Sequence, residues 1–517
     1  MNTKSLWIQD PKLPSFPKLE ANLSVDVIII GGGITGITAA YLLKRAGLSV
    51  ALLERNKCSR AETGHTTAHL TQVTDLRLHR LVERFGEDHG SAVWDAGRAA
   101  IDLIHANLNR ENIDCDFSWV PAYLFESLTG KSSKEAENLK KDTQLADHFE
   151  FDAQYLDSVP IFERPGISFA NQAKFHPVKY LAGLLKTIPG NGSHVFENTE
   201  VNEFLDDPLK IMANGHSIQG NYVVIATHMP LLGNRNTLLA TLFQTKLAAY
   251  STYAIGLKLP KGKYSEALYW DTSDPYYYLR IDRGDAFDYA IFGGEDHKTG
   301  QAVHTDSLFE KLFSTLKPHL PDAEMDLGWS GQIINTNDGL PLIGEIADRQ
   351  FVATGFSGNG MTFGTLSGLM ACDAALGKKN PWKSLFDVHR KNIFGGTWNY
   401  LKENKDYPYY LIKDRIAANE IRSIESVKPG EGVVTKIDGE RFAIYRDLNG
   451  KVTALTAVCP HMGCIVHWNS AETTWDCPCH GSRFKTNGEV IAGPAESPLE
   501  KKVQMKNLIQ KRKTLNT

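Results

Sequence analysis

The sequence of 517 residues lacks several features that would assign it to a partner or a compartment. Its formal net charge of −4 gives no overall basic field, so nucleic-acid binding is not expected. The most apolar run, Val25 to Leu43, contains Asp26 and three successive glycines, so we predict no transmembrane segment. The first twenty residues have no apolar core of signal-peptide length. We therefore expect a cytoplasmic globular protein. Its tail from Lys501 to Lys513 is locally basic, so peripheral contact with a membrane surface stays an alternative.

Cysteine is also scarce, and its seven copies are unevenly distributed. Cys58, Cys115 and Cys372 are scattered, as buried or incidental thiols would be. The other four lie with two histidines in "CPHMGC" (459–464) and "CPCHGSRF" (477–484). This clustering indicates a functional site near the far end of the chain.

A glycine-rich turn marks the first recognisable unit. "VDVIIIGGG" predicts a buried strand, "ITGITAAYLLKRAG" a helix that ends at Gly47, and "LSVALLER" a second strand. Gly31 permits the tight turn, Gly33 lets the backbone approach a pyrophosphate, and Gly36 lets helix and strand pack closely. Glu54 can accept a hydrogen bond from a ribose hydroxyl. The unit predicts a dinucleotide site, and the lack of a second such fingerprint for a nicotinamide domain favours FAD.

Residues 20–378 resemble the FAD-dependent amine and amino-acid oxidoreductases of the D-amino-acid oxidase and glycine oxidase type. The likeness rests on the unit above and on "TGHTTAH", "VVIATH", "DGLPLIG" and "VATGFSGNGMT". It implies that Thr63 to Thr67 lie along the flavin and diphosphate, that the Val201 backbone contacts adenine, and that 338–341 and 355–362 close over the ribityl chain and ring. Besides the three glycines and Glu54, the cofactor residues that it implies are Arg55, Thr66, Thr67, Val201, Asp338, Gly358, Gly360, Met361 and Thr362.

The substrate pocket is expected in the aromatic, strand-rich stretch from 231 to 328. An arginine fork matches the two oxygens of a carboxylate, so Arg280 with Tyr250 and Tyr278 are the main pocket candidates, and Tyr253 and Tyr276 lie in the same stretch. For each of these residues the alternative is a structural role, either on an aromatic face of a sheet or in a surface ion pair. No catalytic side chain is assigned, because in the related enzymes hydride passes to the flavin directly from a neutral amine.

The cysteine-rich segment contains two closely spaced Cys/His pairs. They are Cys459 with His461, and Cys477 with His480. A pair at each of two hairpin tips can converge on one metal centre, and two thiolates with two imidazoles suit either zinc or a mixed-ligand iron–sulfur cluster. Cys464 and Cys479, one in each loop, match nothing in a four-coordinate zinc site, which favours the cluster.

Residues 428–509 resemble a Rieske 2Fe-2S domain of the disulfide-containing kind found in quinol:cytochrome oxidoreductases. The resemblance implies that the two cysteines of the pairs bind one iron and the two histidines the other, and that Cys464 and Cys479 form a disulfide. It also implies that Gly493 to Ala495 form the proline loop that covers the cluster. A disulfide is unusual in a reducing cytosol, so this pairing conflicts with the expected compartment unless burial beside the cluster protects it.

Two neighbouring residues bear on the reduction potential. Ser482 can donate a hydrogen bond to a bridging sulfide, while Phe484 stands where the respiratory relatives have a second donor, a tyrosine. With one donor fewer, we expect a potential within the Rieske range of about −150 to +300 mV but below its upper end.

The expected fold class is α/β: a Rossmann-like FAD-binding domain with an inserted α+β substrate domain, followed by a small all-β Rieske domain. The expected boundaries are 20–80, 175–230 and 332–378 for the FAD-binding domain, 81–174 and 231–331 for the substrate domain, 379–427 for a connector, and 428–509 for the Rieske domain.

A flavin accepts two electrons together, whereas a Rieske cluster carries one at a time. Their union in one chain suggests oxidation of a small amine or amino acid, with electrons passed singly to the cluster and on to an external quinone, ferredoxin or cytochrome-like acceptor. Two alternatives remain: the cluster feeds electrons into the flavin, or it is a structural or sensing module on a flavin oxidase.

Overall fold

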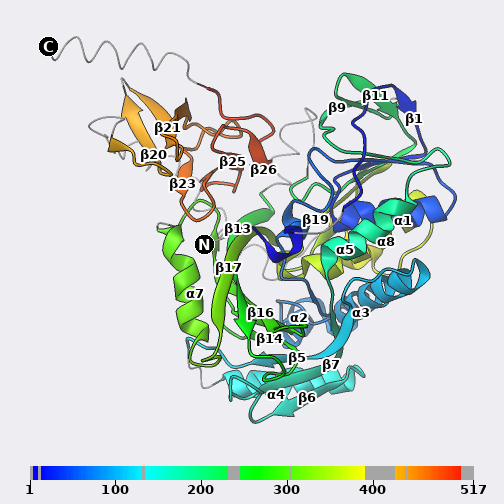
Figure 1. Cartoon of the computed structure of the whole chain (residues 1–517). Helices are drawn as coiled ribbons and strands as arrows, with labels where there is room; N and C mark the ends of the chain where they lie inside the picture. Colours follow the sequence, from blue (N-terminus) through cyan, green and yellow to red (C-terminus); the bar gives the residue numbers. More distant parts are fainter. Residues whose placement is uncertain are drawn as a thin grey trace.

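The computed structural model describes residues 4–9, 13–130, 134–205, 208–230, 245–302, 304–390, 426–437 and 439–501. Most of the expected connector and nearly all of the basic tail lie outside these ranges. The N-terminal part contains two large sheets and one small sheet, and two small sheets form a separate C-terminal unit (Figure 1). No helix in the described ranges has the length and apolarity needed to cross a bilayer.

A six-stranded sheet carries the glycine-rich turn. Its spatial order is β18 (Leu342–Ala347), β19 (Gln350–Thr354), β12 (Tyr222–Ile225), β2 (Val27–Ile30), β3 (Val50–Leu53) and β8 (His194–Phe196). All pairings are parallel except that of β18 with β19. Every residue of β2 and β3 is buried, as expected for a parallel sheet with both faces covered. This arrangement confirms the Rossmann-like fold class.

Two helices pack against this sheet, α1 (Ile34–Arg45) and α8 (Gly360–Ala375), and α5 (Pro177–Thr187) packs against α1. Glycine lets α1 and α8 approach closely, because a Cβ on Gly364 would lie 2.6 Å from the Ile34 side chain. A small four-stranded sheet lies beside them (Figure 1). Its order is β1 (Leu23–Ser24), β11 (His216–Gln219), β10 (Lys210–Ala213) and β9 (Val201–Leu205).

A nine-stranded sheet forms the second large layer. Its main path is β17 (Glu324–Thr336), β13 (Leu247–Leu259), β16 (Asp288–Lys298), β15 (Tyr278–Asp282), β14 (Leu268–Asp271), β5 (Ser118–Phe125), β7 (Gly166–Lys174) and β4 (His69–Leu70), and β6 (Ala153–Leu156) also pairs with β7. The helix α7 (Leu308–Leu316) packs against β13 and β16, and α4 (Glu135–His148) lies over β6 and β7. This sheet brings strands from both parts of the expected substrate domain together.

The helical pattern from Leu76 to Leu108 forms two helices, α2 (Leu78–Phe85) and α3 (Glu87–Arg110). They separate at Gly86, whose φ of +85° does not fit a continuous right-handed helix. A short helix, α9 (Lys383–Phe386), packs against β18. Four short 3₁₀ turns complete the described N-terminal part: η1 (Leu6–Ile8), η2 (Glu62–Gly64), η3 (Thr305–Ser307) and η4 (Ser357–Asn359).

The C-terminal unit consists of two antiparallel sheets, which confirms the predicted small all-β module. One sheet contains β20 (Gly432–Ile437), β21 (Glu440–Arg446) and β22 (Val452–Thr456); the other contains β23 (His467–Asn469), β24 (Thr474–Asp476), β25 (Arg483–Lys485) and β26 (Val490–Ala492). Trp475 and Phe484 are fully buried in its apolar core, together with Cys459, Cys464 and Cys477.

The C-terminal unit packs against one end of the nine-stranded sheet (Figure 1). Asn469 joins the two parts, since its side chain donates to the Tyr253 hydroxyl at 3.3 Å and accepts from Thr305 at 2.9 Å. His467 Nδ1 lies 2.7 Å from the carbonyl oxygen of Gly300. The domain boundaries stay a prediction, but these contacts fix the cysteine-rich loops relative to the sheet.

Candidate active site and metal centre

A cavity of about 730 Å³ lies where the carboxyl ends of β2, β3 and β12 meet. Open parallel sheets bind ligands at this edge, and the volume falls within the range of about 300 to 1,000 Å³ that is usual for ligand and cofactor pockets. The predicted cofactor residues that line the cavity are Gly31, Gly33, Glu54, Arg55, Thr66, Thr67, Val201, Gly358, Gly360 and Met361.

The glycine turn has the geometry that a diphosphate needs. Gly31 has a φ of +110°, and a Cβ there would overlap the Ala226 carbonyl. A Cβ on Gly36 would overlap the carbonyl of Gly31, which explains the close packing of α1 on β2. Among the described residues, only Thr63 Oγ1 would be near a Cβ on Gly33, at 3.1 Å, so the open side of this glycine faces the cavity. The N-terminus of α1 therefore suits an anionic diphosphate.

Glu54 follows β3 and is tied to the glycine turn. Its Oε2 accepts a hydrogen bond from the Gly32 N–H, and its Oε1 accepts one from the Asn56 N–H, both at 2.8 Å. Burial nevertheless raises the pKa of Glu54. Each carboxylate oxygen keeps a second lone pair, so the residue can still accept a ribose hydroxyl. The turn and this acid together fit the adenosine diphosphate part of FAD.

Three predicted cofactor residues do not line the cavity. Gly36 serves the helix packing described above. Asp338 accepts two hydrogen bonds from the Arg390 guanidinium, at 2.7 and 2.8 Å, and Thr362 Oγ1 donates to the Thr71 carbonyl at 3.1 Å. These two side chains are therefore occupied in holding neighbouring segments.

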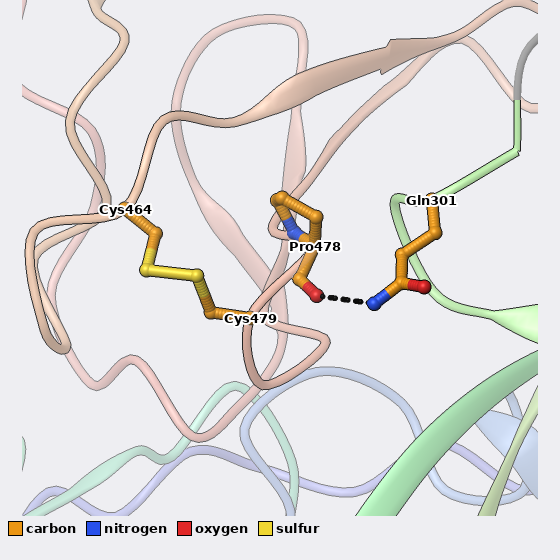
Figure 2. The surroundings of a disulfide bond; sticks show 4 residues. All are labelled: Gln301, Cys464, Pro478 and Cys479. Carbon is orange, nitrogen blue, oxygen red and sulfur yellow. Dashed lines mark hydrogen bonds between the residues drawn. A yellow bond between two sulfur atoms is a disulfide. The ribbon is translucent and has the colours of Figure 1, made fainter. Parts of the chain in front are cut away.

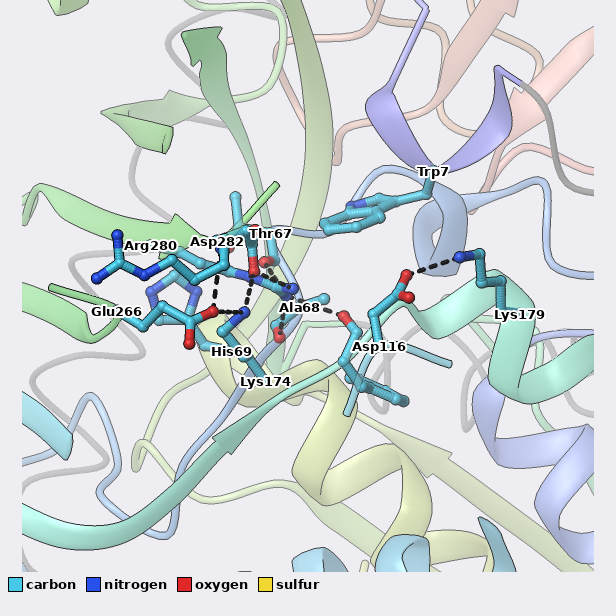
Figure 3. Close-up of polar contacts among 12 residues, drawn as sticks. Trp7, Thr67, Ala68, His69, Asp116, Lys174, Lys179, Glu266, Arg280 and Asp282 are labelled. Atoms are coloured by element: carbon cyan, nitrogen blue, oxygen red, sulfur yellow. Dashed lines mark hydrogen bonds and ion pairs between the residues drawn. The ribbon is translucent and has the colours of Figure 1, made fainter. Parts of the chain in front are cut away.

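Arg280, the expected carboxylate partner, lies outside the cavity in the buried network of Figure 3. Its Nε is 3.0 Å from both carboxylate oxygens of Asp282, and its Nη1 donates to the carbonyls of Ala68 and Phe175 at 2.9 Å. The indole of Trp7 covers the guanidinium, whose carbon lies 5.0 Å from the ring centroid. Only 1% of the residue is exposed, so a substrate carboxylate cannot reach it.

Of the other substrate candidates, Tyr276 and Tyr278 line the cavity, whereas Tyr250 and Tyr253 do not. The Tyr276 and Tyr278 rings lie side by side, with centroids 5.7 Å apart. Tyr278 is the first residue of β15, and Tyr276 lies two residues before it, in the segment that leads into the strand.

Four further residues line the cavity that no sequence pattern had indicated: Asp75, Thr252, Trp270 and Asp296. Asp75 accepts hydrogen bonds from the Tyr276 hydroxyl at 3.1 Å and the Gly358 N–H at 2.7 Å. Burial raises the pKa of Asp75 and raises that of Asp296 to about 7. Side chains of a regular strand alternate between its two faces, but in β16 this alternation is interrupted at Glu295, whose φ is +59°. A simple strand pattern therefore does not predict that Asp296 faces the cavity.

The four predicted cluster ligands converge in the C-terminal unit. The buried thiols of Cys459 and Cys477 share a hydrogen bond, which lowers the pKa of Cys459 and raises that of Cys477. The rings of His461 and His480 meet edge to face, with centroids 4.9 Å apart. Two sulfur and two imidazole donors thus reach one place from two loops, and this donor set fits a 2Fe-2S cluster with mixed ligands.

The predicted disulfide between Cys464 and Cys479 is present and joins the two loops (Figure 2). Both of its sulfurs lie within 4.8 Å of the Cys477 sulfur. Because the disulfide sulfurs are already bonded to each other, they do not add to the ligand set. The extra pair of cysteines therefore has the tying role that the Rieske resemblance implied.

Ser482 also lies beside the ligands. Its hydroxyl hydrogen-bonds the Cys459 thiol and accepts the Ala495 N–H at 3.0 Å. The expected proline loop is thereby held against the cysteine-rich loops.

The proline loop and its neighbours also reach the dinucleotide cavity, which the sequence did not indicate. Ile491, Ala492, Gly493 and residues 495–498 line the cavity. The Arg55 guanidinium donates to the Ile491 carbonyl at 2.8 Å. The C-terminal unit therefore supplies part of the wall around the predicted adenosine end.

A second connection joins the cavity to a cluster loop. Gln332 lines the cavity, and its side-chain amide donates to the Gly481 carbonyl at 2.8 Å, one residue after His480. The Gln332 N–H in turn donates to Glu62, which also lines the cavity, at 2.6 Å. A Cβ on Gly481 would overlap Ala249, so the loop is packed tightly against β13 and β17.

Comparison with known proteins agrees with both sites. The model of the FAD dependent oxidoreductase family (DAO) matches residues 26–374, and that of the Rieske [2Fe-2S] domain matches residues 418–504. The Rieske 2Fe-2S iron-sulfur protein YhfW of Bacillus subtilis is 32% identical over 502 residues, which cover 96% of this chain and 97% of that protein.

Two further relatives resemble the N-terminal part. Gamma-glutamylputrescine oxidoreductase of Escherichia coli is 22% identical over 426 residues, 78% of this chain and 96% of that protein. The crystal structure of glycine oxidase from Geobacillus kaustophilus superposes with a TM-score of 0.60 at 18% identity, covering 72% of this chain and all of that chain. The chain therefore belongs to the FAD dependent oxidoreductase family, in a form that carries a C-terminal Rieske [2Fe-2S] domain.

Proposed function

We propose that the protein oxidises a small amine or amino acid and passes the electrons singly through its own Rieske centre to an external acceptor such as a quinone, ferredoxin or cytochrome-like protein. When bound, FAD supplies two-electron oxidation of a carbon next to nitrogen, and the 2Fe-2S cluster supplies one-electron transfer. The chain's residues hold the two cofactors close together and shield the path between them from water.

The hydrogen bond from Gln332 to the Gly481 carbonyl is the observation that carries this proposal. Gln332 belongs to the cavity wall, and Gly481 follows the predicted ligand His480 directly. Gln332 is only 2% exposed, so this contact is buried between the two parts of the molecule. It supports transfer within one molecule, because a cluster loop held on the cavity wall is within reach without any domain movement.

The proposed cofactor residues have distinct tasks. The N-terminus of α1 with Gly31 and Gly33 binds the diphosphate, and Glu54 accepts the ribose hydroxyl. Cys459 and Cys477 bind one iron, and the two histidines bind the other. The relative that acts on gamma-glutamylputrescine, an amine by its name, supports amine oxidation as the reaction.

Anaerobic stopped-flow mixing of the holoprotein with a panel of amines and amino acids tests the proposal. Flavin bleaching should come first, and the loss of the cluster's visible absorption should follow at a rate independent of protein concentration. Reduction of the cluster before the flavin by a quinol or reduced ferredoxin, with no response to amines, would reverse the proposed direction. A cluster that stays oxidised while the flavin is fully bleached would contradict the proposal altogether.

Gln332→Leu tests the contact itself. Losing the amide frees the Gly481 loop, so we expect the second phase to slow on the order of tenfold while flavin bleaching is unchanged. Gln301→Leu is the matched control, because Gln301 donates to the Pro478 carbonyl of the same loop at 3.0 Å but does not line the cavity (Figure 2). Equal rates in the two variants would show that the Gln332 contact has no special part in the transfer.

A further inference from the structure

The end of the cavity that the nine-stranded sheet forms has its own chemical character. Its walls carry three aromatic side chains, Trp270, Tyr276 and Tyr278, together with the carboxyl groups of Asp75 and Asp296. Burial raises the pKa of both tyrosines, so their hydroxyls stay neutral at physiological pH. The compartment is thus aromatic and acidic.

No cationic side chain balances these acids among the described residues. Arg55 is the one lysine or arginine among the described residues that line the cavity, and it bonds the Ile491 carbonyl at the predicted adenosine end. Burial lowers the pKa of His69 to about 4, so this nearby lining residue is neutral. Arg280 is held by Asp282 outside the cavity. Buried carboxylates are normally paired, so this end suits a ligand that brings the positive charge.

The two acids differ in how well they are already bonded. Both oxygens of Asp75 accept hydrogen bonds, one from Tyr276 and one from Gly358. Asp296 has a hydrogen bond with Thr252, whose hydroxyl also meets Tyr278 at 2.8 Å, but its buried Oδ1 has no hydrogen-bond partner within the described residues. Asp296 is therefore the acceptor that a ligand can satisfy.

Aromatic rings add to the attraction for a cation, because the faces of Trp and Tyr are electron-rich. The Tyr276 and Tyr278 rings, 5.7 Å apart, stand beside the open carboxyl oxygen in the same cavity. A substrate carboxylate would instead meet two acids and no described cationic partner.

We propose that this compartment binds a cationic nitrogen of the substrate, with Asp296 as its anchor and Trp270, Tyr276 and Tyr278 as its walls. The substrate class is then an amine with a second, protonated nitrogen, that is a diamine or polyamine, rather than an amino acid with a free carboxylate near the reacting carbon. This inference rests on the proposed amine oxidation, and it specifies which amines are taken.

Binding to the oxidised holoprotein tests it without turnover. Butyltrimethylammonium and butanoate have the same chain length and opposite charge, and calorimetry with the change in flavin absorption reports their affinities. We expect the cation to bind at least about tenfold more tightly than the anion, because the acids attract a positive charge and the aromatic faces stabilise it. An equal or tighter affinity for butanoate in the wild-type protein would overturn the proposal.

Asp296→Asn should lower the affinity for the cation by at least about tenfold, since the charge attraction between the buried carboxylate and the quaternary nitrogen is lost. The matched control is Glu295→Gln, which removes a charge from the adjacent residue; Glu295 bonds Tyr277 and Lys311 and does not line the cavity. Unchanged cation binding in Asp296→Asn, or an equal loss in both variants, would also overturn the proposal.

Substrates separate this inference from the proposed function. Under argon, 1,4-diaminobutane should bleach the flavin at least about tenfold faster than 4-aminobutanoate at equal, low concentration. A preference for 4-aminobutanoate contradicts the cationic compartment, whatever happens at the cluster. Failure of the cluster to be reduced contradicts the proposed electron route and leaves the binding result standing.

Discussion

The two sites of the molecule are assembled in different ways. All four predicted cluster ligands and the disulfide lie between residues 459 and 480, on two loops of one small unit. The dinucleotide cavity is lined by residues from Ile30 to Pro498, which come from both large sheets and from the C-terminal unit. A site made of two short loops depends mainly on its own fold, whereas a composite cavity depends on how separate parts dock.

This difference implies an asymmetry between the cofactors. The cluster should form whether or not FAD is bound, because no residue of the N-terminal part is a predicted ligand. The cavity, in contrast, is partly lined by residues 491–493 and 495–498 of the C-terminal unit. Loss of the cluster should therefore disturb FAD binding slightly, and loss of FAD should leave the cluster intact.

Cys477→Ser should have the largest effect, because it removes a thiolate ligand. We expect iron and acid-labile sulfide to fall to background, while FAD stays bound with an affinity lowered by no more than about tenfold, which corresponds to one lost buried hydrogen bond. Metal, sulfide and flavin analyses of anaerobically purified protein measure this. Cys372→Ser, which changes a buried thiol on α8, is the control. Complete loss of FAD in Cys477→Ser would show that the two sites are not separable.

Gly33→Val tests the asymmetry from the other side, by weakening FAD binding while leaving the cluster ligands unchanged. In the part of the chain that the structure describes, only Thr63 Oγ1 would be near a new Cβ on Gly33, so the sheet should still fold. The valine side chain would, however, occupy space facing the cavity. The overlap should weaken FAD binding on the order of 10- to 100-fold. Flavin titration of the apoprotein measures the loss, and the iron and sulfide content should equal that of the wild type. A parallel loss of cluster would refute the asymmetry.

The same contrast explains what could be predicted from the sequence. The turn around Gly31 and the Cys/His pairs are local patterns in which spacing alone sets the geometry, and the structure has both. The acidic compartment instead depends on the register of β15 with β16 and on a loop that brings Asp75 close to them. These residues are distant in the sequence, so no local sequence pattern predicts that they are neighbours.

The internal partner of Arg280 could have been predicted from the sequence. Arg280 and Asp282 are two residues apart in β15, so both side chains lie on one face and can pair. That spacing already favoured an internal ion pair over a substrate contact. Asp338 differs, because its partner Arg390 is distant in sequence and only the fold brings them together.

Replacing both Cys464 and Cys479 with alanine should destabilise the cluster unit by an intermediate amount. The cross-link spans 15 residues, and loop closure of this length is worth about 3 kcal/mol in the chain-entropy model. Denaturant titration followed by cluster absorption gives the change in the free energy of unfolding, and FAD release serves as the readout for the other site. A destabilised FAD site with an unaffected cluster would contradict the local role of the disulfide.

Phe484→Tyr should have the smallest effect, and it concerns the cluster alone. Phe484 is fully buried in the same apolar core as Cys459 and Cys477, so we expect a phenol hydroxyl at this position to reach a ligand sulfur. A donor to sulfur stabilises the reduced cluster, so the reduction potential should rise. A hydrogen bond worth about 0.5 to 1.5 kcal/mol corresponds to about 20 to 60 mV for one electron. Redox titration followed by electron paramagnetic resonance measures the shift, with Phe442→Tyr in the other small sheet as the control. The flavin potential should stay constant in both variants, because neither substitution touches the cavity that would hold FAD. A lowered cluster potential in Phe484→Tyr would mean that the hydroxyl disrupts the core instead of donating to sulfur.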